Sequence, residues 1–122
     1  MKIRLGKIQG FGAVGHWLHQ RMTAIAIIPL SVWFLTSLLG QMNSTYEEVV
    51  IWIRSPVVTV LMVFLIGGVF YHAKLGVQVV IEDYIHTEAT KIILLGALTL
   101  STTIGGIIGV LSILKIAFLT QF

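Results

Sequence analysis

Three apolar runs, each about as long as a bilayer crossing, take up most of this chain of 122 residues. They cover approximately residues 21–40, 57–81 and 91–118, and a transmembrane helix needs ~20 such residues. Only 11% of the residues are charged and the mean hydropathy is +0.97, whereas soluble domains are about 25% charged. The sequence therefore predicts an all-α membrane protein with three transmembrane helices.

Little sequence lies outside these runs, so we expect residues 1–122 to form a single membrane domain. Such a chain offers no place for enzymatic chemistry on water-soluble substrates. It contains no cysteine, which excludes disulfides, iron–sulfur clusters and zinc–thiolate sites on this chain. Its net charge of +3 reports membrane topology rather than binding to nucleic acid.

Basic residues are distributed unevenly around the first run. Four precede or open it, namely Lys2, Arg4, Lys7 and Arg21, whereas the loop at 41–56 contains only Arg54. The positive-inside rule therefore places the N-terminus inside and this loop outside. We expect residues 1–12 to be a lead-in rather than a signal peptide, because a short apolar core and a cleavage site are missing. Within the loop, Tyr46–Ile53 is expected to be a short interfacial segment.

The second run contains a histidine in apolar surroundings, and an ionisable group in lipid usually has a function. In a helix, Gly68 and Gly76 lie one turn on either side of His72 and leave a flat recess beside its ring. Such a recess suits a porphyrin, whose iron needs a ring nitrogen while the macrocycle lies against bare backbone. The alternative is a histidine hydrogen-bonded to a neighbouring helix, with glycines that let the helices approach. The spacing leaves both interpretations open.

A low-spin b-type haem usually has two axial protein ligands. The other three histidines are expected at span ends, about 15 Å from the depth of His72; they are His16, His19 and His86. We therefore expect any second ligand to come from another subunit. His16, Trp17, His19 and Arg21 would instead form a headgroup-level site for an anion or a quinone, or be ordinary anchoring residues.

An acid and a phenol follow the second run directly. Asp83 lies on the same helix face as His72, within about 20° and roughly 16 Å along the axis, and Tyr84 is its neighbour. Both are within reach of water and of a ligand beneath the headgroups, as proton delivery to a reduced group requires. The alternative is a solvated helix end.

Small residues recur every four positions in the third run, at Ala97, Ser101, Gly105 and Gly109. A stripe of this kind lets helix backbones come close, so we expect it to pack against another helix. Pro29 lies inside the first run, where a membrane bundle tolerates it as a kink.

Two segments together carry a family resemblance. They are Gly-His-Trp at 15–17 with Gln-Arg-Met-Thr-Ala at 20–24, and His-Ala-x-x-Gly at 72–76 followed by Asp-Tyr at 83–84. In residue types, spacing and placement they resemble the small hydrophobic membrane-anchor subunit of succinate dehydrogenase, respiratory complex II, of the cytochrome b556 type. The resemblance covers the three-span layout and nearly the full length.

The resemblance implies a role for several of these residues. His72 would be one axial ligand of haem b, shared with a larger cytochrome b anchor subunit that completes the helical bundle. Arg21 would lie near the haem propionates, and so would His16, although it is displaced by one residue from the family pattern. Tyr84 would bond a ubiquinone carbonyl oxygen, with Asp83 supporting proton delivery.

The resemblance also implies the remaining partners. A flavoprotein subunit would oxidise succinate, as in the tricarboxylic acid cycle, and an iron–sulfur subunit would carry the electrons to quinone, so this chain would hold no dicarboxylate site. The membrane would be the bacterial cytoplasmic or the mitochondrial inner membrane.

Three other interpretations are weighed against this one. The anchor of a fumarate reductase would have a similar sequence. A proton-relay or transport subunit would use His72, Lys74 and Asp83, but a relay needs a continuous polar path, and the first and third runs have no charge at depth. A purely structural assembly subunit would bind neither haem nor quinone.

Overall fold

The computed structural model describes the backbone of residues 2–119 and the side chains of residues 14–119. Four helices follow one another: α1 (Lys2–Gly40), α2 (Tyr46–Arg54), α3 (Pro56–Tyr84) and α4 (Glu88–Leu119). Over these residues the chain forms no strand. Three helices, α1, α3 and α4, are long and apolar enough to cross a membrane. The predicted all-α fold with three candidate transmembrane helices is confirmed.

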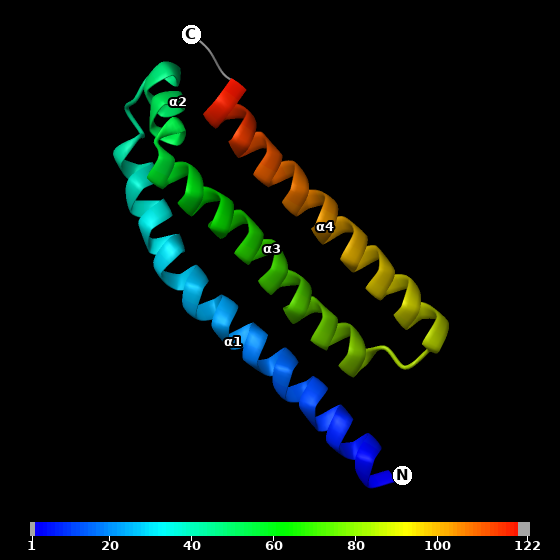
Figure 1. Cartoon of the computed structure of the whole chain (residues 1–122). Coiled ribbons are helices and arrows are strands. Elements are labelled where there is room, and N and C mark those ends of the chain that lie inside the picture. Colours follow the sequence, from blue (N-terminus) through cyan, green and yellow to red (C-terminus); the bar gives the residue numbers. More distant parts are fainter. Residues whose placement is uncertain (1, 120–122) are drawn as a thin grey trace.

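Helix α3 lies between α1 and α4 and runs antiparallel to both of them (Figure 1). It packs against both neighbours, whereas α1 and α4 do not contact each other in the part of the chain that is described. Its central position explains why most of the buried side chains belong to it, namely Thr59, Met62, Leu65, Leu75 and Ile81. No described side chain of α1 or α4 is fully buried.

Helix α1 extends well beyond the first predicted run. It begins at Lys2, inside the expected lead-in, and its apolar candidate span includes residues 14–20, which precede the predicted run. Nothing in residues 2–21 stops a helix, because each interior glycine costs only about 1 kcal/mol and the first proline is Pro29. The side chains of Lys2, Arg4 and Lys7 lie outside the described ones, so the predicted orientation of the N-terminus stays a prediction.

The predicted interfacial segment is the short helix α2. Thr45 caps it with a reciprocal pair of bonds, in which Glu48 N–H donates to Thr45 Oγ1 at 3.3 Å and Thr45 N–H donates to Glu48 Oε2 at 2.7 Å. Thr59 of α3 then donates its hydroxyl to the Ile53 carbonyl at 2.6 Å. This bond ties the end of α2 to the start of α3.

The two glycines of the predicted small-residue stripe pack on α3, whereas Ala97 and Ser101 are exposed. A Cβ added at Gly105 would lie 2.6 Å from Phe70 Cε1, and one added at Gly109 would lie 2.9 Å from Ile66 Cγ2. Both distances are below van der Waals contact, so these two positions have no room for a side chain as the helices lie. Gly105 and Gly109 therefore let α3 and α4 approach closely.

Candidate functional site

His72 lies on the side of α3 that faces α1. Its ring is half-buried, and its Nδ1 lies 2.9 Å from the hydroxyl oxygen of Thr23 on α1. This bond fixes the position of one ring nitrogen and leaves Nε2 for another partner. The His72 ring can therefore bond to the neighbouring helix through Nδ1 and still offer Nε2 to a ligand.

The two glycines beside His72 share its face, as predicted, but α1 covers that face. A Cβ at Gly68 would meet Ile27 Cγ1 at 3.4 Å, and a Cβ at Gly76 would meet Gln20 Nε2 at 3.6 Å. The recess predicted one turn above and below the ring therefore lies against α1 side chains. The glycines let α1 and α3 approach closely at the level of His72.

The depth expected for His19 is wrong. Its Nδ1 lies 3.3 Å from the hydroxyl oxygen of Tyr71, and the two rings are 6.4 Å apart between centroids. His19 is one helical turn, about 6 Å, from Thr23, which contacts His72, so its depth differs from that of His72 by much less than 15 Å. The reason is that α1 begins well before Arg21, so residues 14–20 continue the helix alongside the C-terminal half of α3.

One side of α1 presents polar groups to α3 around this histidine. These polar residues are His16, Gln20 and Thr23, at helical spacing, and the apolar Ile27 follows one turn further on the same side. His16 Nε2 and Gln20 Oε1 are buried and have no hydrogen-bond partner among the described residues. Buried polar atoms normally bond to protein, water or a ligand. We therefore expect a further polar partner for these two atoms.

Gln20 and Thr23 were not singled out by sequence reasoning, although both belong to the motif at 20–24. Their helical spacing from His16 would identify them only if the first helix were known to begin before Arg21. Their importance thus depends on where the helix begins.

Arg21 lies on the other side of α1. Its guanidinium carbon is 4.7 Å from the centroid of the Trp17 ring, and both side chains are exposed. An arginine over a tryptophan face makes a cation–π contact. The chain on its own therefore does not bring Arg21 to His72.

Asp83 and Tyr84 are at the last turn of α3, and both are exposed, Tyr84 to 75%. Eleven residues separate Asp83 from His72, which is about 16 Å along a helix. The nearby Gln78 amide donates to Glu82 Oε1 at 3.1 Å and so occupies a different carboxylate. The pair is thus open to a ligand at the end of the helix, at a different depth from His72.

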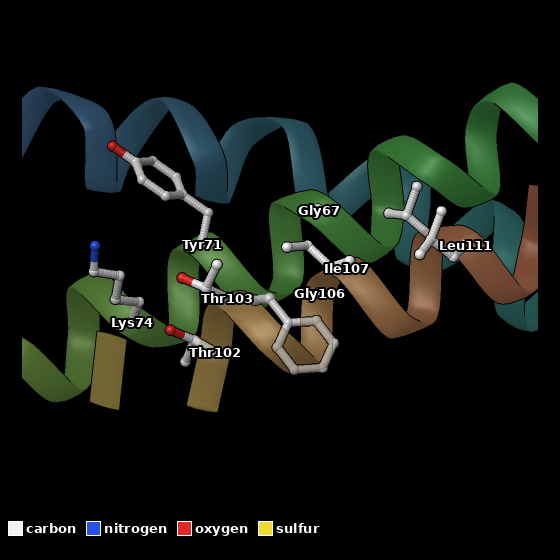
Figure 2. Close-up of a pocket in the computed structure, with 10 residues that line it drawn as sticks. Gly67, Tyr71, Lys74, Thr102, Thr103, Gly106, Ile107 and Leu111 are labelled. Atoms are coloured by element: carbon white, nitrogen blue, oxygen red, sulfur yellow. The ribbon is translucent and has the colours of Figure 1, made fainter. Parts of the chain in front are cut away.

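Two grooves flank α3. The first, of about 610 Å³, lies between α1 and α3 and begins at Thr23 and Gly68, next to His72. The second, of about 450 Å³, lies between α3 and α4. Figure 2 shows Tyr71 and Lys74 at one end of the second groove, and Leu111 toward the other. Lys74 thus faces α4 rather than the His72 side of α3.

Residues 2–106 match the family described as succinate dehydrogenase/fumarate reductase transmembrane subunit. The chain belongs to this family. The match covers α1, α2, α3 and the first half of α4, and so includes every candidate site residue. Membership in this family favours the anchor interpretations over the proton-relay interpretation. With its three apolar helices, this transmembrane subunit is a multi-pass membrane protein.

Individual relatives carry a more specific name. The transmembrane subunit is similar to the succinate dehydrogenase hydrophobic membrane anchor subunits of Rickettsia bellii, at 40% identity over 70 residues, and of Rickettsia conorii, at 38% over 71 residues. Each alignment covers 57% of this chain and 56% of the relative. The chain therefore matches little more than half the length of these curated relatives.

Although α1 covers the recess predicted beside the ring, individual groups near His72 suit the haem b that the resemblance implies. His72 Nε2 is a nitrogen ligand of the type that haem iron takes, and the adjoining groove is lined mainly by apolar side chains. The buried His16 Nε2 could bond to a carboxylate, as a propionate requires. No cluster of three or more ligating side chains occurs in the described part of the transmembrane subunit.

Proposed function

We propose that this chain is the hydrophobic membrane-anchor subunit of a succinate dehydrogenase, and that it holds one side of a haem b through His72. Its family, the name carried by its Rickettsia relatives and the three apolar helices support the anchor role. The second axial ligand comes from a larger anchor subunit. The exposed sides of α1 and α4 leave room for the helices of that partner.

The position of the His72 ring carries the haem proposal. Its Nδ1 is bonded to Thr23, so Nε2 is the nitrogen that binds iron. His19 has its Nδ1 turned to Tyr71 and is not the second ligand. Haem b, when bound, supplies a one-electron carrier within the membrane.

The quinone proposal places ubiquinone at the end of α3. The Tyr84 hydroxyl donates a hydrogen bond to a quinone carbonyl oxygen, and the Asp83 carboxyl passes protons from water to the reduced oxygens. Both side chains are exposed at the helix end, as this chemistry needs. Reduction to quinol takes two electrons, which an iron–sulfur subunit delivers from succinate oxidised on a flavoprotein subunit. No dicarboxylate chemistry belongs to this chain.

The reduced-minus-oxidised visible spectrum of the purified complex tests the haem proposal. Bands of a b-type haem should be present in the wild-type complex and lost in His72→Ala, because the iron loses an axial ligand. His19→Ala is the matched control, since His19 lies on α1 within about one helical turn of the depth of His72, and it should keep the bands. Haem bands that persist in His72→Ala, or that disappear in His19→Ala, would contradict the assignment.

A further inference from the structure

Thr23 makes three contacts through one hydroxyl group. Its Oγ1 lies 2.9 Å from the His19 carbonyl oxygen, 2.9 Å from the Gln20 carbonyl oxygen and 2.9 Å from His72 Nδ1. A hydroxyl has one hydrogen to donate and two lone pairs to accept with. The three contacts therefore limit the direction of the bond to His72.

Other threonines of this chain make the same pair of backbone contacts. Thr36 Oγ1 lies 2.8 Å from the Val32 carbonyl and 3.0 Å from the Trp33 carbonyl, and Thr102 makes the same pair of bonds in α4. A helical threonine commonly bonds back to the carbonyls three and four residues earlier. Thr23 has this same pair of carbonyls within reach, and donation to either of them would leave a lone pair to face His72.

We propose that Thr23 is a positioning residue for His72: it accepts a hydrogen bond from Nδ1–H and so selects the tautomer in which Nε2 is unprotonated. The inference rests on the proposed function, because an unprotonated Nε2 matters only if it binds iron. Thr23 does not touch the iron itself.

The fold makes this acceptor rigid. The hydroxyl is anchored by two carbonyls of α1, and α1 is held close to α3 where Gly68 and Gly76 lack side chains. The partner of the second ring nitrogen sets the tautomer and orientation of a ligating histidine and raises its basicity. Loss of such a partner typically weakens metal binding 10- to 100-fold.

The test compares three variants of Thr23 in the purified complex. Thr23→Val keeps the shape and removes the hydroxyl, Thr23→Ala removes it without steric demand, and Thr23→Ser retains it. Thr36→Val is the matched control, because Thr36 makes the same two backbone bonds on α1 without a histidine. Haem transfer to an excess of a haem-scavenging protein and the haem midpoint potential are measured, with His72→Ala alongside.

Thr23→Val and Thr23→Ala should release haem roughly 10- to 100-fold faster than the wild type. Their midpoint potential should rise, because a less basic histidine stabilises ferric iron less. Thr23→Ser and Thr36→Val should resemble the wild type in both measurements. A merely structural role for Thr23 would not shift the potential.

Wild-type rates and potentials in both Thr23→Val and Thr23→Ala would overturn the inference, and so would a Thr36→Val variant that behaves as they do. If His72→Ala nevertheless loses its haem bands, the proposed function survives that result. Haem bands that persist in His72→Ala would overturn the proposed function and, with it, the role of Thr23.

Discussion

His72, Asp83 and Tyr84 lie on one helix but in different environments. The histidine is half-buried against α1 and has one nitrogen bonded to Thr23. The acid and the phenol are exposed at the helix end. With about 16 Å of helix between them, a ligand at Tyr84 and a ligand on His72 would be separate molecules at different depths.

Tyr84→Phe should slow quinone reduction by about fivefold or more, because a neutral hydrogen bond is worth about 1 kcal/mol. Succinate oxidation by a soluble dye should be unchanged, since the dye takes electrons before they reach the quinone. Tyr46→Phe is the control: Tyr46 is also 75% exposed, but it begins α2, at the opposite end of the molecule (Figure 1). Equal loss of both activities in Tyr84→Phe would contradict the quinone role.

At the scale of the helices, close packing is achieved with glycine. Gly105 and Gly109 let α4 lie against Phe70 and Ile66 of α3. In lipid, apolar burial gives no driving force between helices, so close backbone approach and van der Waals contact stabilise the pair. The α3–α4 pair therefore depends on positions where even one methyl group does not fit.

Gly109→Ala should destabilise the chain in detergent by about 1–3 kcal/mol, the usual cost of overpacking. The added carbon would lie 2.9 Å from Ile66 Cγ2, which is attached to a branched carbon and cannot turn away freely. At Gly96 a Cβ meets nothing within 4 Å, so Gly96→Ala should be neutral or stabilising by up to about 1 kcal/mol. The free energy of unfolding checks both, and equal values would contradict the packing argument.

The whole molecule is a layer of three long helices with α3 in the middle (Figure 1). The connection between α3 and α4 lies at the same end as the start of α1, while α2 lies at the other end. Positive charge near the start of α1 predicts that the first of these ends is inside. We therefore expect the connection between α1 and α2 and the connection between α3 and α4 to lie on opposite sides of the membrane.

Single cysteines can test this orientation cleanly, because the chain has none of its own. Asn43→Cys, between α1 and α2, should react with an impermeant maleimide added to intact cells. Thr87→Cys, between α3 and α4, should react only after permeabilisation. Both positions are exposed. The opposite labelling pattern would reverse the topology.

The sequence by itself determined the three helices and the packing of Gly105 and Gly109. It did so because chain length, hydropathy and four-residue spacing are local properties, and lipid demands long apolar helices whatever the partners. It also identified His72, since an ionisable group in an apolar run is conspicuous without any structure.

Only the tertiary structure decided what surrounds His72. Thr23 is 49 positions away, and no local pattern gives the register between α1 and α3. That register follows from side-chain contacts such as Ile27 on Gly68 and Gln20 on Gly76. With this register, His19 contacts Tyr71 and Thr23 contacts the His72 imidazole. The reason is that two antiparallel helices are aligned by where their surfaces fit rather than by where each enters the membrane.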